Sequence, residues 1–195
     1  PPPAPPPRWL PDRSWRPHWL PLNIPALEQL QPTGAGGLFF CLPVLERLKF
    51  PAWLLAQEGL YEAGFAWNVF SELLHRTQNP PEEPLAALCA ALGAPEPAAD
   101  PAPWAGQVEA WLTRLEVEDP LPWLVQRKAL FSCTPTHLDL VLPVKEAEIP
   151  LRRWALDTDP GWVPYLGRVI ATHYLENADF LRLSAMIQAE AAGAR

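Results

Sequence analysis

Basic residues are too few in this sequence to balance the acidic ones, with 15 lysines and arginines against 22 aspartates and glutamates. The formal charge of -7 and the isoelectric point near 5.1 come without any basic cluster that would neutralise nucleic-acid phosphates. Long apolar runs are also lacking, since the longest uncharged apolar stretch, residues 33–45, is shorter than the ~20 residues of a membrane span and contains Pro43. We therefore expect neither non-specific nucleic-acid binding nor a membrane span.

Cysteine is scarce as well. Cys41, Cys89 and Cys133 are odd in number, widely separated, and each placed in an apolar stretch. This pattern favours buried, reduced thiols in a cytosolic protein over a disulfide framework. The sequence begins at Pro1, without methionine or a signal-peptide pattern. We expect a cytoplasmic protein, present here as a piece of a longer polypeptide.

Proline, in contrast, is abundant and concentrated at one end, with ten of the 27 prolines among the first 25 residues. Such a composition favours an extended polyproline II conformation. A short repeat, Arg-Trp-Leu-Pro at residues 8–11 and His-Trp-Leu-Pro at 18–21, carries Trp9 and Trp19 ten residues apart. Residues 1–25 are either a linker whose tryptophans fold back on the domain or a docking tail that contacts a partner through Trp9 and Trp19.

Helical periodicity dominates residues 26–130. After a flexible, glycine-rich segment at 33–37, apolar residues at helical spacing predict a helix over 38–49, kinked at Pro43. Two apolar stripes between Phe65 and Leu74 predict a helix that is buried on most sides. Further helices are predicted to begin near Asn79 and after Asp100, and around residues 123–130.

The pattern then changes to the two-residue period of β-strands. Leu138, Leu140 and Leu142 alternate with more polar residues and predict a strand. Residues 149–154, with Pro150 at an edge position, and residues 169–174 predict two more, followed by a helix from residue 177. Helices before contiguous strands predict an α+β fold, in which an N-terminal helical bundle (26–130) packs as one domain with a small antiparallel β-meander and C-terminal helix (131–195).

Motifs of nucleophilic and phosphate chemistry are missing. The sequence has no G-x-S-x-G, no P-loop, no H-E-x-x-H and no C-x-x-C. Cys133 and His137 are four residues apart, which on an extended strand separates them by ~13 Å, beyond hydrogen-bond reach. We expect no catalytic cysteine here.

A metal site on the predicted sheet is the alternative that chemistry allows. Its donors would be two histidines and three aspartates that three neighbouring strands bring to one face: His137, Asp139, Asp157, Asp159 and His173. The competing interpretation is structural, because aspartates and a Pro-Gly pair are typical of a turn. In that case Asp157, Asp159, Trp162 and Arg168 shape an aromatic-filled corner whose ion pairs fix its geometry.

The C-terminal segment, residues 136–175, resembles poorly characterised, tape-measure-like or assembly proteins of bacterial extracellular contractile injection systems, which are phage-tail-like machines. The resemblance is carried by T-H-x-D at 136–139, L-D-x-D-P-G-W at 156–162 and L-G-R-V at 166–169. Residues 34–50 and the helix around Trp67 resemble an upstream helical part of such proteins. The resemblance implies an assembly component and supplies no catalytic residues.

These observations predict a non-catalytic assembly or protein-interaction module of a bacterial contractile injection machine. It would use no cofactor and no metal, and its partners would be other protein subunits. The alternative is a metal-dependent hydrolase or transferase that uses the His/Asp cluster on the C-terminal sheet.

Overall fold

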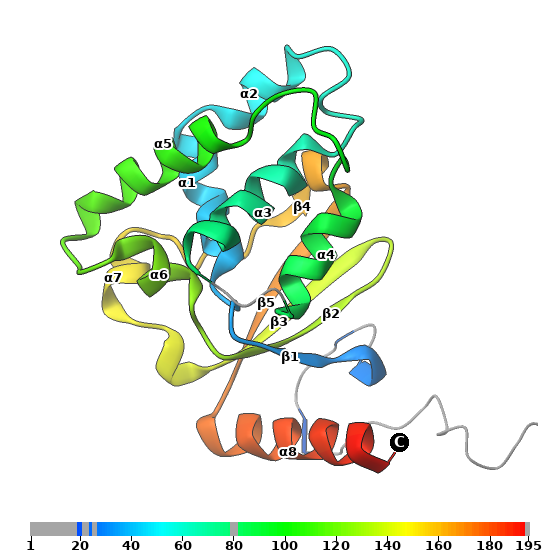
Figure 1. Ribbon diagram of the computed structural model, residues 1–195. Helices are drawn as coiled ribbons and strands as arrows, with labels where there is room; N and C mark the ends of the chain where they lie inside the picture. Colours follow the sequence, from blue (N-terminus) through cyan, green and yellow to red (C-terminus); the bar gives the residue numbers. More distant parts are fainter. Residues whose placement is uncertain (1–18, 21–23, 25–26, 79–81, 194–195) are drawn as a thin grey trace, which may run out of the picture.

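Five strands form one mixed sheet, in the order β1-β2-β3-β5-β4, with helices on both faces (Figure 1). The computed structural model describes residues 19–20, 24, 27–78 and 82–193. Helices α1 to α6 cover one face of the sheet, and α8 crosses the other face. The strands are β1 (Gln31–Thr33), β2 (Ala129–Cys133), β3 (His137–Pro143), β4 (Gly161–Val163) and β5 (Arg168–Leu175).

The helices are short except for α3, α5 and α8. The α-helices are α1 (Leu42–Arg47), α2 (Phe50–Leu55), α3 (Phe65–Arg76), α4 (Pro84–Leu92), α5 (Ala102–Leu112), α6 (Pro120–Val125), α7 (Ile149–Arg153) and α8 (Asn177–Gly193). The 3-10 helices are η1 (Leu27–Gln29), η2 (Leu38–Cys41), η3 (Thr113–Leu115), η4 (Val144–Glu146) and η5 (Pro164–Leu166). Pro43 lies in the first turn of α1, directly after η2, so it starts a helix where a kink was expected.

The strand pairing differs from the predicted meander. β1, β2 and β3 pair antiparallel, as do β4 and β5, but β3 and β5 run parallel, with His137 opposite Val169 and Pro143 opposite Leu175. A parallel pair requires a crossover connection, and residues 144–167, which include α7 and β4, provide it. The mixed α and β composition is therefore confirmed, whereas the all-antiparallel topology is wrong.

Residues 149–154 are the second correction, because they form helix α7 where a strand was predicted. Pro150 lies in the first helical turn, and Glu148 precedes it in an extended conformation. A proline fits either an edge strand or the first turn of a helix, since neither position requires its missing N–H group. In α7 the proline takes the second role, and Leu151 is buried in the main core.

The glycine-rich segment at 33–37 is held in place by backbone hydrogen bonds, contrary to the flexibility predicted for it. Gly36 N–H donates to the Arg127 carbonyl at 2.8 Å, and Gly37 N–H donates to the Val125 carbonyl at 3.1 Å. A Cβ atom on Gly37 would lie 1.8 Å from the Leu124 carbonyl oxygen. Glycine is required at position 37 because the segment touches the backbone of the last turn of α6.

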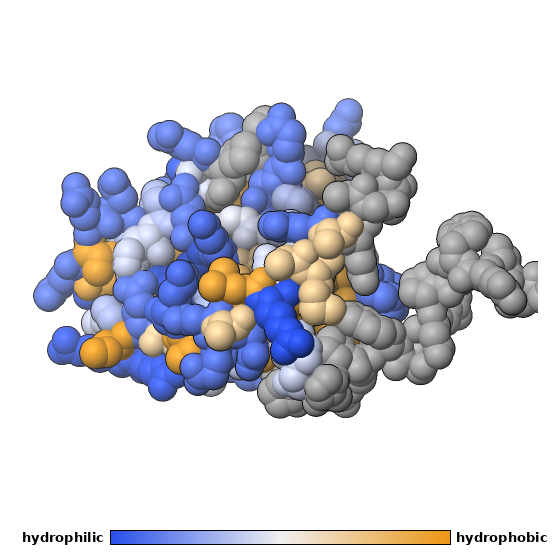
Figure 2. Space-filling model, turned by 90° about the horizontal axis from the view of Figure 1, so that it is seen from below, coloured by the Kyte–Doolittle hydropathy of each residue, from blue (hydrophilic) through white to orange (hydrophobic). Residues whose placement is uncertain are grey.

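The sheet divides the buried apolar residues into two clusters. Leu138, Leu140 and Leu142 face α1 to α6 and join the larger cluster. Leu130 and Val141 face α8 and pack with Phe180 in the smaller one. Seen from the α8 side, the surface is mainly hydrophilic with small separate hydrophobic patches (Figure 2). Alternate residues of β2 and β3 thus contribute to the hydrophobic clusters on opposite faces of the sheet.

Arg127 ties α6 to the start of the crossover. Its guanidinium donates to the carbonyl of Leu124 at 3.1 Å and to that of Glu146 at 2.9 Å. It also donates to the Glu148 carboxylate at 3.0 Å and lies 4.8 Å from the centre of the Trp123 ring. The side chain is 2% exposed, so these partners replace water around a buried charge.

Candidate functional site

The predicted corner at residues 152–168 forms one wall of a pocket. After α7, Ala155 adopts a positive φ of 50° and turns the chain toward β4, which begins at Gly161 with a φ of 64°. The chain then passes through η5 and turns again at Gly167, with a φ of 65°. These three turns bring residues 155–165 against α1, and the space between them, the corner pocket, measures about 460 Å³.

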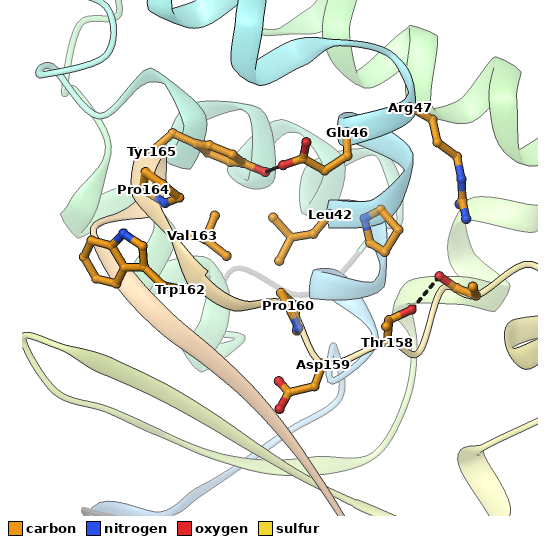
Figure 3. A pocket seen from close by; sticks show the side chains of 12 residues that line it. Leu42, Glu46, Arg47, Thr158, Asp159, Pro160, Trp162, Val163, Pro164 and Tyr165 are labelled. Carbon is orange, nitrogen blue, oxygen red and sulfur yellow. Dashed lines mark hydrogen bonds between the residues drawn. The ribbon is translucent and has the colours of Figure 1, made fainter.

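The floor of the corner pocket is apolar and comes from two distant parts of the chain. Leu42 of α1 and Val163 of β4 lie between its ends, and Pro160 and Pro164 line its sides (Figure 3), while Pro43 also belongs to the lining. Leu42 and Val163 also belong to the main core. Since the floor is continuous with the core, its shape is fixed by packing.

At one end of the pocket, Glu46 and Tyr165 point toward one another (Figure 3). The Tyr165 hydroxyl donates to the Glu46 carboxylate at 3.4 Å. Burial and the neighbouring Glu46 carboxylate raise the pKa of Tyr165, because both disfavour a phenolate. Tyr165 therefore stays protonated and acts as a donor to Glu46, which is itself exposed.

At the other end, Arg47 is already occupied. Its guanidinium donates to the Trp154 carbonyl at 2.6 Å and lies 5.1 Å from the centre of the Trp111 ring. Thr158 donates its hydroxyl proton to the Ala155 carbonyl at 2.9 Å (Figure 3). These contacts stabilise the loop and hold the Arg47 guanidinium against Trp154 and Trp111, while Glu46 and Asp159 give the lining two carboxylates against this one cation.

Asp159 and Trp162 are the two predicted corner residues that line the pocket. Both are exposed, and Trp162 lies at the rim on the side opposite Arg47, 58% exposed (Figure 3). An aromatic side chain of this size is normally buried, at least in part, against other groups. Its exposure beside an apolar floor is the feature that marks this pocket as a candidate binding site.

Asp157 and Arg168 have other partners. Asp157 pairs with Arg152 at 3.5 Å, across the turn that follows α7. Arg168 donates to the carbonyls of Thr134 at 3.1 Å and Leu166 at 3.3 Å, and it lies 5.5 Å from the centre of the Trp67 ring. Arg168 thus supports the ends of β5 and the β2–β3 turn, and the ion pair near the corner is formed by Arg152.

The five proposed metal donors do not converge. His173 and Asp139 contact each other, with 2.8 Å between Nε2 and Oδ1, on the sheet face that α8 partly covers. Asp157 pairs with Arg152 and Asp159 lines the pocket, while His137 Nδ1 lies 2.9 Å from the Thr136 hydroxyl. Within the described ranges, no group of three or more histidine, cysteine or acidic side chains is arranged to hold a metal ion.

The cysteines are held as thiols. Burial raises the pKa of Cys41 to about 12, and it also raises the pKa of Cys89. Burial raises the pKa of Cys133 as well, although the nearby Arg168 acts in the opposite direction. The Cys133 thiol contacts the Thr134 carbonyl at 3.6 Å. A protonated thiol is a poor nucleophile, and at Cys133 the effect of burial outweighs that of Arg168.

Of the two tail tryptophans, Trp9 lies outside the described residues. Trp19 is half-buried and packs, with Leu20, against the smaller hydrophobic cluster. The guanidinium of Arg182 on α8 lies 4.5 Å from the centre of the Trp19 ring. Trp19 therefore makes an intramolecular contact, and a role for either tryptophan in partner binding stays a prediction.

Sequence reasoning found one wall of the pocket and missed the other. Leu42, Glu46 and Tyr165 were not singled out, because Glu46 and Tyr165 are 119 positions apart and their contact depends on the crossover topology. The available signal was Glu46 itself, the charged residue that directly follows the uncharged run of residues 33–45 within the predicted helix.

No protein-family model, curated protein or solved structure matches the chain. Among the described helices, none combines the length and apolar character needed to cross a bilayer. The corner pocket is therefore the structural feature that points to a function.

Proposed function

We propose that the protein is a non-catalytic protein-interaction module whose corner pocket receives a short extended segment of a polypeptide. The observation that carries this proposal is Trp162, 58% exposed at the rim of an apolar pocket of about 460 Å³. Exposed tryptophans next to apolar pockets are typical of the residues that dominate binding energy at protein interfaces. The carboxylates of Glu46 and Asp159 add polar groups that fix the orientation of a bound segment.

The chemistry of the lining favours binding over catalysis. A catalytic site needs a nucleophile or an acid and base pair within hydrogen-bond reach of a reacting group. Here the Tyr165 hydroxyl donates to Glu46, and the Arg47 guanidinium and Thr158 hydroxyl donate to backbone carbonyls. The hydroxyl and guanidinium groups of the lining thus already have protein partners, and the apolar floor, the exposed rim and the two carboxylates remain for a ligand.

The setting we propose is the assembly of a bacterial contractile injection system in the cytoplasm, with other protein subunits as partners. Its support is the resemblance of residues 136–175, which include Asp159, Trp162 and Tyr165 of the pocket. A binding role for the pocket agrees with this setting, because assembly components work through contacts with other subunits.

A site-specific photo-crosslinker tests the proposal. It is placed at Trp162 and, as a matched control, at Leu181, which is 67% exposed on α8. In the native host we expect one polypeptide segment, of another protein or of this chain, to be crosslinked from position 162 and not from 181, with the product lost in the Asp159→Lys variant. Sheath, tube or baseplate subunits would support the contractile setting, while another protein would support the interaction module and contradict that setting. Equal products from both positions, or no product at all, either within this chain or with another protein, would contradict the binding role.

A further inference from the structure

The corner pocket combines three properties that together describe one class of ligand. Its floor, with Leu42 and Val163, is apolar; its sides carry prolines; and its rim carries Trp162. Its net charge is negative, because the lining carries two exposed carboxylates, Glu46 and Asp159, and one guanidinium, Arg47, which is directed to the Trp154 carbonyl. Grooves with exposed aromatic rings bind proline-rich segments in the polyproline II conformation, in which little chain entropy is lost on binding. A basic, proline-rich segment with a large apolar side chain therefore fits this lining.

The N-terminal region of this chain has that chemistry. Residues 1–25 contain ten prolines, three arginines and a single aspartate, although the whole chain has a net charge of -7. Within this region, residues 8–11 read Arg-Trp-Leu-Pro. We propose that the corner pocket binds residues 8–11 of this chain, with Arg8 directed to the carboxylates of Glu46 and Asp159 and with Trp9 and Leu10 on the apolar floor. This inference rests on the proposed function and names the occupant of the pocket.

The second copy of the repeat supports the assignment. Residues 18–21 read His-Trp-Leu-Pro, and its Trp19 and Leu20 pack against the smaller hydrophobic cluster. Arg182 on α8 covers the Trp19 ring at 4.5 Å. The Trp-Leu pair of one repeat thus already binds an apolar surface of this molecule. The corner pocket offers the Trp-Leu pair of residues 8–11 a comparable apolar surface. Its neighbouring charged groups are carboxylates, which suit a repeat that begins with arginine.

The test is a binding measurement between the full chain and a synthetic peptide. The peptide spans residues 5–16 with a fluorescent label, and the protein carries Arg8→Glu and Trp9→Ala so that its own segment does not compete. We expect saturable binding by fluorescence anisotropy. Trp162→Ala should weaken it about tenfold or more, as is typical of an interface tryptophan. Glu46→Gln with Asp159→Asn should weaken it only about fivefold at low salt, since exposed ion pairs are individually weak, and less in 0.5 M salt because salt screens them.

Matched controls distinguish binding in the pocket from non-specific electrostatic attraction between the acidic protein and the basic peptide. Glu58→Gln with Glu118→Gln removes the same charge from exposed positions outside the pocket lining and should change the affinity less than about twofold. A peptide with Trp9→Ala should lose saturable binding. The melting temperatures of the pocket variants should match that of the parent, which excludes misfolding as the cause.

The inference would be overturned by an absence of saturable binding, or by equal losses in the pocket and control variants. If the peptide does not bind while the crosslinker at Trp162 still captures a protein, the occupant is wrong and the interaction module stands. If both experiments fail, the binding role of the pocket fails with them.

Discussion

Among the described residues, three side chains of ionisable residue types, Glu83, Arg127 and Asp139, are buried. They differ in how many hydrogen-bond and ion-pair partners replace the lost water. Glu83 accepts hydrogen bonds from the Thr33 hydroxyl and, at 3.1 Å, from Gly34 N–H. Arg127 is surrounded by carbonyls and two carboxylates. Asp139 has His173 on one oxygen, whereas its Oδ2 has no protein partner within the described structure. Burial of a charge is tolerated only with such partners, so these residues fix local geometry.

Arg127→Ala is expected to destabilise the protein by about 3–5 kcal/mol, because it leaves a buried acceptor set without its cation. The carbonyls of Leu124 and Glu146 would lose their donor, and Trp123 would lose the guanidinium that stacks on it. Chemical denaturation followed by circular dichroism measures the change. Arg153→Ala is the control, since Arg153 is exposed on α7 and its loss should stay within about 0.5 kcal/mol. Equal effects of the two changes would contradict the role assigned to Arg127.

At the scale of single elements, the contact between the 33–37 segment and the end of α6 makes a prediction about glycine. Gly37→Ala should cost about 3 kcal/mol or more, because its Cβ would overlap the Leu124 carbonyl oxygen at 1.8 Å. Gly106→Ala, inside α5, should instead stabilise by about 0.5–1 kcal/mol, since its Cβ would meet only Arg76 Nη1 at an ordinary 3.6 Å. Thermal melts of both variants test the opposite signs, and a tolerated Gly37→Ala would show that the segment is looser than its hydrogen bonds indicate.

Local periodicity predicted the elements whose burial is one-sided or complete. The stripes between Phe65 and Leu74 correspond to α3, and the alternation of Leu138, Leu140 and Leu142 corresponds to β3. Prediction was weaker where a residue type suits two structures. Pro150 fits an edge strand or a first helical turn, and α4 begins with Glu83 as its cap, whereas Asn79 lies outside the described residues.

For the whole molecule, the topology was out of reach because it depends on long-range pairing. β1 has three residues and no periodicity to reveal it, yet it pairs with β2 about a hundred positions later in the chain. The parallel pairing of β3 with β5 then decides where the 155–165 segment lies, and so decides that Asp159 and Trp162 meet Leu42 and Glu46. Asp159 and Trp162 could be singled out from the sequence of the corner. The pocket that they line could not, because it depends on the pairing of β3 with β5.

The two hydrophobic clusters share the strands of one sheet, which makes their unfolding interdependent. Leu130 belongs to the smaller cluster and its neighbour Phe131 to the larger one, so neither layer can separate without exposing the other face of β2. Phe180→Ala on α8 should cost about 3–5 kcal/mol, which for a protein of this size corresponds to a melting temperature lowered by about 6–20 °C. Leu181→Ala, next to it and 67% exposed, should have little effect.

The cooperativity of the Phe180→Ala variant is the decisive observation. If the clusters form one unit, helix content by circular dichroism and tryptophan fluorescence will fall in a single coincident transition in the parent and in Phe180→Ala. If α8 unfolds first, the helical signal will show an earlier step, while the tryptophans of the larger cluster, such as Trp67 and Trp104, keep their environment. In that case α8 would be an independently detachable layer, and the Trp19 contact beneath Arg182 would detach with it.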